Sequence, residues 1–153
     1  MNKFELTAEF VTNVFGKKLF RIKALVAFGN VEKGELGGFI EKEDNLSHDG
    51  NAWVSGNAQV SGNAQVYGDA RVSGDAQVSG NADYAAVAGF GRYSRTTTFF
   101  RCKDKILRVQ CGCFYGDLAQ FREIVKKTHG DSKYAKEYLA IADLMELHFS
   151  DEY

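Results

Sequence analysis

A six-residue phrase, Gly-Asn/Asp-Ala-x-Val-Ser/Tyr, repeats between Gly50 and Ala82. In an extended segment residues i and i+2 point to the same side, so each Ala-x-Val directs Ala and Val inward and x outward. Gly adopts positive φ without steric cost, and Asn and Asp tolerate it better than most residues, so Gly-Asn/Asp predicts a sharp corner in every repeat. Three such sides close a coil of about eighteen residues, the arrangement of hexapeptide parallel β-helices. The sequence therefore predicts a short parallel β-helix of about two to three coils.

Residues one coil apart should stack, and the sequence pairs compatible side chains at that offset. The expected pairs are Val54 with Val72, Val60 with Val78, Ala52 with Ala70, Ala58 with Ala76 and Gln59 with Gln77. The inward phase begins earlier, at Ile40 and Leu46, and is expected to continue through Ala88 and Phe90.

The outward positions of the repeat carry no regular array of one residue type. They are Trp53, Gln59, Gln65, Arg71, Gln77 and Asp83. A flat ice-binding or lectin-like face would need repeating Thr or aromatic residues there, so the repeat is interpreted as a scaffold.

Composition limits the classes of protein that the chain can belong to. With 153 residues and 44% apolar content, it can bury the core of one compact unit or two small ones. The net charge of −1 predicts no nucleic-acid partner and no membrane partner. Charged residues interrupt positions 1–20, so no signal peptide is expected, and the predicted location is cytoplasmic, in the bacterial host.

The three cysteines, Cys102, Cys111 and Cys113, are an odd number with no disulfide framework, which fits a reducing compartment. The pair Cys111 and Cys113 suggests a zinc site, because thiolates are zinc ligands. Structural zinc takes four ligands at a different spacing, so these cysteines are interpreted as small strand residues, and no metal or cofactor is predicted.

Three segments follow from the pattern: a β cap over residues 1–39, the repeat over 40–90 and an α+β domain over 91–153. Alternating apolar residues predict strands at 4–14 and 18–28, which would cover the open end of the first coil. The predicted fold class is mainly β, with a short parallel β-helix and a small α+β C-terminal part.

The C-terminal segment predicts a hairpin followed by two helices. Residues 96–101 and 106–111 form the two expected strands. Asp117 is the expected N-cap of a first helix, with Gln120 three residues on, and Gly130 is its expected end. A second helix is expected to start at residue 131 or 132.

Several phrases outside the repeat carry a family resemblance. With Gly34-Glu-Leu-Gly-Gly-Phe-Ile-Glu41 and Glu43-Asp-Asn-Leu-Ser-His-Asp-Gly-Asn-Ala-Trp53, residues 18–82 resemble phage and prophage-associated hexapeptide-repeat proteins. Some of these are labelled acyltransferases or polymer-forming proteins. The stretch Thr96-Thr-Thr-Phe-Phe-Arg101 looks like part of a module of mobile-element proteins. The resemblance implies a left-handed β-helix and a phage context, and it transfers no catalytic residue.

An enzymatic alternative is a trimeric hexapeptide-repeat acyltransferase using acyl-coenzyme A, with a His as general base. Only His48 lies near the repeat. It belongs to the phrase Asn45-Leu-Ser-His48, and a corner or capping role explains it more simply than a role as general base. The chain is too short for the long groove of such enzymes, and it lacks a phosphate-binding Gly-rich loop and a G-x-S-x-G elbow. No catalytic residue is predicted, and the balance favours a protein that is not an enzyme.

The stretch after the repeat is strongly basic, because residues 92–108 contain six Lys and Arg against the single acid Asp104. Guanidinium groups bind phosphate, hydroxyls and small residues let backbone amides approach it, and aromatic rings stack on bases. The predicted ligand-binding residues are Arg92, Tyr93, Ser94, Arg95, Thr96, Thr98, Phe100, Arg101 and Arg108. Because strand residues alternate, only one set of residues 96–101 can face a ligand. The alternative is a strand with one buried face and one solvated basic face.

The favoured hypothesis is a non-enzymatic phage protein that counters host defence by sequestering an anionic small molecule such as a nucleotide second messenger. It is expected to be a homo-oligomer, with a trimer favoured. The alternative is an inhibitor that binds a host defence protein. His129 is expected to cap or pack a helix rather than to bind a ligand.

Overall fold

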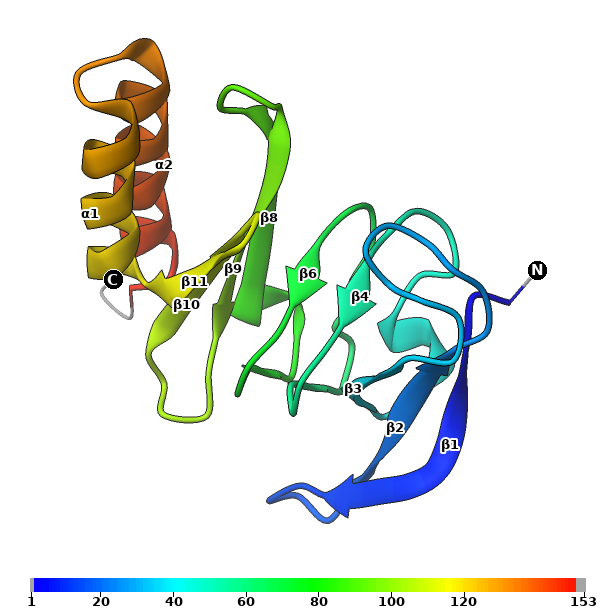
Figure 1. Cartoon of the computed structure of the whole chain (residues 1–153). Coiled ribbons are helices and arrows are strands. Elements are labelled where there is room, and N and C mark those ends of the chain that lie inside the picture. The colour runs from blue at the N-terminus through cyan, green and yellow to red at the C-terminus, as the bar shows by residue number, and fades with distance from the viewer. Residues whose placement is uncertain (1, 151–153) are drawn as a thin grey trace.

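The computed structural model describes residues 2–150, except for the side chain of Asn81. Its elements follow one another along the molecule, from an N-terminal hairpin through the repeat and a four-stranded sheet to two C-terminal helices (Figure 1). Strand β1 and the two helices lie at opposite sides of this arrangement (Figure 1).

The N-terminal part contains the two predicted strands, which form a hairpin. Strands β1 (Phe4–Thr12) and β2 (Lys18–Ala24) pair antiparallel, with Phe10 opposite Phe20. Strand β2 also pairs antiparallel with β3 (Leu36–Ile40). A 3-10 turn, η1 (Glu43–Asn45), then leads into the repeat.

The repeat supplies four strands of two residues each. They are β4 (Trp53–Val54), β5 (Gln59–Val60), β6 (Arg71–Val72) and β7 (Gln77–Val78). Strand β6 lies parallel to β4 and β7 parallel to β5, with Val72 opposite Val54 and Val78 opposite Val60. The predicted offset is confirmed for these pairs, and the repeat alanines and valines from Ala52 to Val78 are buried as expected.

The prediction of a left-handed parallel β-helix of two to three coils is wrong. Over residues 2–150 the structure contains a mixed sheet of order β1-β2-β3-β5-β7, the pair β4-β6 and a separate four-stranded sheet. The glycine corners leave only two residues of a repeat in each strand, and β3 pairs on its other side with antiparallel β2 instead of with another repeat. The largest sheet is therefore mixed rather than coiled.

Three positions also differ from the inward and outward pattern. Trp53, expected outside, is 2% exposed and meets the Phe28 ring edge-on at 5.3 Å, because the chain before β3 folds over it. Ala88 and Phe90, expected in the inward phase, lie in a strand of the four-stranded sheet, where Ala88 is exposed. The chain leaves the repeat at a second 3-10 turn, η2 (Asn81–Asp83), so the hexad no longer sets their direction.

The four-stranded sheet is antiparallel, in the order β11-β10-β9-β8. Its strands are β8 (Tyr84–Phe90), β9 (Arg95–Arg101), β10 (Leu107–Cys111) and β11 (Phe114–Asp117). Tyr84 and Phe100 pack into the core of the repeat, whereas Phe99 and Val109 pack into a second core under the helices. The sheet is thus covered on both faces.

Both predicted helices are confirmed. Asp117 caps α1 (Leu118–His129) by accepting a hydrogen bond from the backbone N–H of Gln120, and Gly130 with φ 57° follows its end. The Ser132 side chain caps α2 (Lys133–His148). Neither described helix is long and apolar enough to cross a membrane.

Candidate functional site

A cleft of about 480 Å³ opens between α1, α2 and the loops at one end of the four-stranded sheet, and we call it the Arg95 cleft. Its lining residues are Arg92, Tyr93, Arg95, Cys111, Cys113, Phe114, Phe121, Ile124, Val125, Thr128, His129 and Tyr138. Three of the nine predicted ligand-binding residues, Arg92, Tyr93 and Arg95, are among them.

The turn between β8 and β9 brings these three residues to the cleft. Gly91 with φ 82° and Ser94 with φ 51° reverse the chain there. The guanidinium carbon of Arg95 lies 5.2 Å from the centre of the Tyr93 ring. A Cβ on Gly112 would overlap this guanidinium, so a glycine in the β10–β11 turn gives Arg95 its place.

Aromatic rings form the inner wall of the cleft. The centroid of Phe121 lies 5.8 Å from that of Phe114 and 5.8 Å from that of Tyr138, and His129 stacks on Tyr138 at 5.8 Å. The Tyr138 hydroxyl donates to the carbonyl of Phe90 at 3.1 Å. Burial raises the pKa of Tyr138 to about 12, so this hydroxyl stays protonated near neutral pH.

The four predicted arginines differ in whether an acidic side chain of the protein compensates their charge. Arg101 lies 3.4 Å from a carboxylate oxygen of Asp83 and donates to the carbonyl of Phe149 at 3.0 Å. Arg108 holds both carboxylate oxygens of Asp104, at 3.0 and 2.9 Å, and thereby lowers the pKa of that carboxyl. Arg92 and Arg95 are exposed, and no acidic group within residues 2–150 forms an ion pair with them. Their charges are available to a ligand, whereas the charges of Arg101 and Arg108 are already compensated.

A second cleft of about 520 Å³ shares Arg95 and Cys113 with the first, and we call it the polar cleft. Besides these two residues it is lined by Gly29, Asn30, Val31, Asn51, Trp53, Asp69, Arg71, Ser94, Thr96 and Gly112. The predicted residues Ser94 and Thr96 therefore border this neighbouring space instead of the Arg95 cleft.

The remaining two predicted residues lie in the protein interior. Thr98 is 1% exposed and accepts a hydrogen bond from the backbone N–H of Arg71, and Phe100 is fully buried in the repeat core. The face of β9 that carries them is covered by the repeat, so the structure does not bring them to either cleft.

Sequence reasoning missed the aromatic wall. Phe121 and Tyr138 were visible only as apolar positions on helix faces, which predict packing. His129 was assigned to capping or packing a helix, and its stacking on Tyr138 agrees with the packing role. Only the path of the chain after β11, which lays α1 beside the β8–β9 turn, places these rings next to Arg95.

The cysteines do not form a metal site in the described part of the chain, where no group of three or more His, Cys, Asp or Glu side chains is placed to hold an ion. Cys111 accepts a hydrogen bond from the Thr97 hydroxyl at 3.2 Å, and Cys113 is exposed. Cys102 is buried, and burial raises the pKa of its thiol.

Comparison with known proteins finds no match for this sequence, either among models of protein families or among curated proteins.

Proposed function

We propose that the protein is a non-enzymatic binding protein that holds an anionic small molecule with an aromatic ring, such as a nucleotide, in the Arg95 cleft. The observation that carries the proposal is the position of two uncompensated guanidinium groups, Arg92 and Arg95, beside an aromatic wall. Guanidinium groups bind phosphate through paired N–H donors, and aromatic faces stack on bases.

The polar cleft gives the same ligand room for a sugar. Asn51 and Asp69 line it, and amide and carboxylate groups donate to and accept from sugar hydroxyls. Because Arg95 borders both clefts, a diphosphate beside it, as in ADP-ribose, would have its adenosine in the Arg95 cleft and its second ribose in the polar cleft. The resemblance to phage proteins favours sequestration of a nucleotide second messenger as the biological role.

Titration calorimetry with AMP, ADP-ribose, a cyclic dinucleotide and inorganic phosphate tests the proposal. Arg95→Ala and Arg92→Ala should each weaken binding of a nucleotide about tenfold or more, since a charge-assisted hydrogen bond contributes about 1.5–3 kcal/mol. Lys33→Ala, which removes a charge from an exposed loop, should leave the affinity unchanged. Chromatography should recover the ligand chemically intact. No binding of any of these probes, unchanged affinity in both arginine variants or conversion of the ligand would overturn the proposal.

A further inference from the structure

A cleft of about 300 Å³ lies between the tips of two hairpins, and we call it the hairpin cleft. The turn between β1 and β2 contributes residues 13–15, and the turn between β9 and β10 contributes Lys105. Both tips stand at the same end of the repeat strands (Figure 1), and outward residues of the repeat form the floor between them. The hairpin cleft shares no lining residue with the Arg95 cleft, so it is a separate site.

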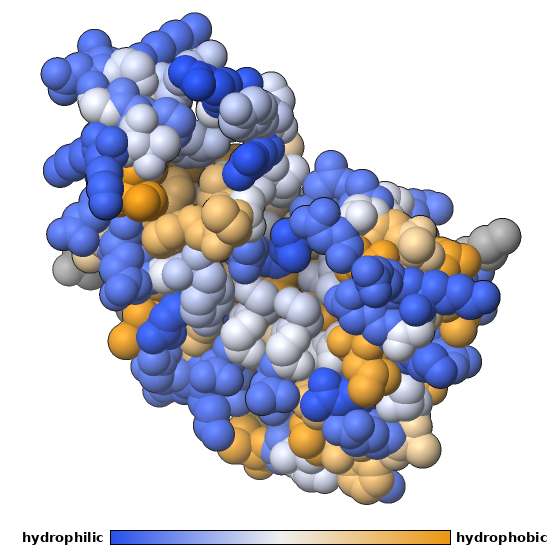
Figure 2. Space-filling model, in the orientation of Figure 1, coloured by the Kyte–Doolittle hydropathy of each residue, from blue (hydrophilic) through white to orange (hydrophobic). Residues whose placement is uncertain are grey.

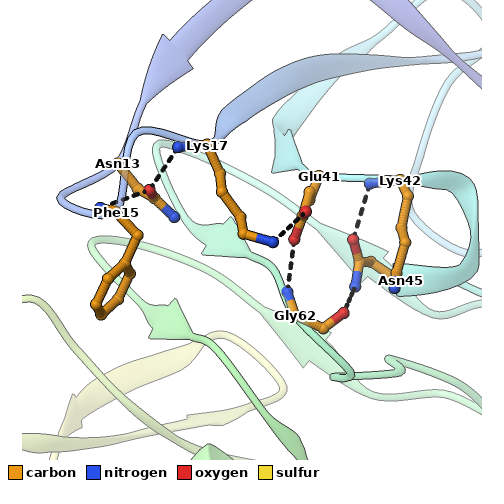
Figure 3. A network of polar contacts seen from close by, with 7 residues as sticks. All are labelled: Asn13, Phe15, Lys17, Glu41, Lys42, Asn45 and Gly62. Carbon is orange, nitrogen blue, oxygen red and sulfur yellow. Dashed lines mark hydrogen bonds and ion pairs between the residues drawn. The ribbon is translucent and has the colours of Figure 1, made fainter.

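An aromatic ring is held open to solvent at one side of this cleft. Phe15 is 79% exposed, although its backbone is fixed. The side-chain oxygen of Asn13 accepts hydrogen bonds from the backbone N–H groups of Phe15 and Lys17, at 2.9 and 3.0 Å, and Lys17 pairs with Glu41. Hydrophobic residues reach the surface along the edge where this tip stands (Figure 2), and the Phe15 ring points away from the polar contacts of the tip (Figure 3). The ring is therefore positioned but uncovered.

The floor of the hairpin cleft is polar. Gln59 and Gln77 lie side by side on the parallel strands β5 and β7, and Ser61 lies beside them. No group of residues 2–150 forms a hydrogen bond with either of the two side-chain amides. A side-chain amide offers donors and an acceptor together, as a hydroxyl does. Two neighbouring amides therefore suit a ligand with several hydroxyl groups better than a phosphate dianion, which only accepts.

Lys105 supplies positive charge on the side opposite Phe15. Arg101 also lines the cleft, but it lies 3.4 Å from a carboxylate oxygen of Asp83, so these two charges compensate each other. No acidic side chain in the described part of the chain pairs with Lys105. Its φ of 68° is a conformation that glycine and asparagine adopt more easily than lysine. A residue kept in such a conformation beside a cleft points to a functional role.

We propose that the hairpin cleft binds an acidic saccharide, a sugar that carries a carboxylate. The apolar face of the sugar ring packs on Phe15, its hydroxyls bond to the amides of Gln59 and Gln77, and its carboxylate pairs with Lys105. The outward positions of the repeat lack the regular aromatic residues of a lectin-like face, and here the β1–β2 hairpin provides the ring from outside the repeat. The proposal does not depend on a nucleotide in the Arg95 cleft.

NMR titration with galacturonate, glucuronate and trigalacturonate tests the proposal, with galactose and glucose as the neutral counterparts. At least one acidic sugar should bind, and its neutral counterpart should bind about fivefold more weakly, since it lacks the partner of Lys105. Tighter binding of trigalacturonate than of galacturonate would support a segment of an acidic polysaccharide as the ligand. Equal binding of the two would support a single acidic sugar.

Exposed variants with matched controls assign the binding to this cleft. Phe15→Ala should weaken binding about tenfold, because the sugar loses the ring on which it packs, whereas Tyr67→Ala removes an exposed ring elsewhere and should not. Lys105→Gly should weaken binding of the acidic sugar about fivefold and leave the melting temperature undiminished, because glycine adopts φ 68° readily. Lys103→Ala removes a charge from the same turn outside the cleft and should bind like the wild type.

Three results would overturn the proposal. They are no binding of any of the acidic sugars, equal affinity of the wild type for acidic and neutral sugars, and unchanged affinity in both Phe15→Ala and Lys105→Gly.

Discussion

The hydroxyl of Thr98 accepts a hydrogen bond from the backbone N–H of Arg71 at 3.0 Å, and this contact joins the four-stranded sheet to the repeat. Nearby, the backbone N–H of Lys103 donates to the carbonyl of Asp75 at 2.9 Å, and Ala76 forms a bridge with Cys102. The end of the repeat would otherwise expose backbone groups. Strand β9 and the turn after it pair with these groups, so the C-terminal sheet closes the repeat.

Thr98→Val should destabilise the protein by about 1–3 kcal/mol, because a methyl group of similar size replaces the acceptor of the Arg71 N–H in a buried contact. The free energy of unfolding from urea titration measures this. Thr96→Val, two residues earlier on the same face and partly exposed, is the matched control and should cost about 0.5 kcal/mol or less. Equal losses in the two variants would contradict the role of the Thr98 hydroxyl.

Asn45 is the buried centre of a second polar network (Figure 3). Its side-chain oxygen accepts from the backbone N–H of Lys42 at 2.9 Å, and its nitrogen donates to the carbonyls of Gly62 at 3.2 Å and Ala64 at 2.9 Å. Asn45→Ala leaves these groups without their partner, and we expect a loss of about 2–3 kcal/mol in the free energy of unfolding.

The same network offers a control at its exposed end. The amino group of Lys17 at the tip of the β1–β2 hairpin lies 3.3 Å from Glu41 (Figure 3). Lys17→Met removes this exposed ion pair and should cost about 1 kcal/mol or less. Chemical denaturation of both variants separates the stability that the buried Asn45 hydrogen bonds contribute from the stability that the exposed Lys17–Glu41 ion pair contributes. A larger loss of stability in Lys17→Met than in Asn45→Ala would refute the assignment of Asn45 as the centre of the network.

The features that the sequence predicted correctly depend on local chemistry. The buried alternation from Ala52 to Val78 follows from a period of two, and the ends of α1 follow from the cap at Asp117 and the glycine at Gly130. These signals act within a few residues. They specify each element without its distant partners.

The wrong predictions concern distant partners. Whether β3 pairs with another repeat or with β2 depends on which segment of the folded chain reaches it, and the hexad carries no information on that choice. The candidate site shows the same limit. A local excess of charge identified Arg92 and Arg95, but alternation alone could not decide which face of β9 the repeat covers, so Thr98 and Phe100 were included.

Gly112→Ala should weaken the binding of a nucleotide if the Arg95 cleft is the site. A Cβ there would meet the Arg95 guanidinium and displace it, and φ 57° adds backbone strain of about 1–2 kcal/mol. Gly34→Ala is the matched control, because Gly34 also has positive φ, 88°, but has open space around it. Calorimetry should show reduced affinity in Gly112→Ala alone, while thermal unfolding should show a loss of stability in both variants.

The contribution of Lys3 to the stability of the protein should rise between pH 8 and pH 10. This side chain is 3% exposed, its amino group donates to the carbonyl of Ala52 at 2.7 Å, and it lies 4.5 Å from the centre of the Phe28 ring. Burial lowers the pKa of Lys3 from 10.5 to about 8. Between these values the unfolded chain binds a proton at Lys3 that the folded protein has lost, so the contribution of Lys3 to the free energy of unfolding increases with pH through this window.

A comparison with Lys3→Met isolates this effect, because the variant keeps an unbranched apolar stem and loses the titrating group. The difference in unfolding free energy, wild type minus variant, should become more positive from pH 8 to pH 10. Measurements stop at pH 10, since burial raises the pKa of Tyr84 and of Tyr138 to about 12 and so reduces stability with rising pH above their unfolded value of 10.0. Lys33→Met is the control for the loss of one positive charge at an exposed position. A difference that stays constant or falls over this range would show that Lys3 keeps its proton in the folded protein, and that the Ala52 carbonyl and the Phe28 ring stabilise its charge enough to offset burial.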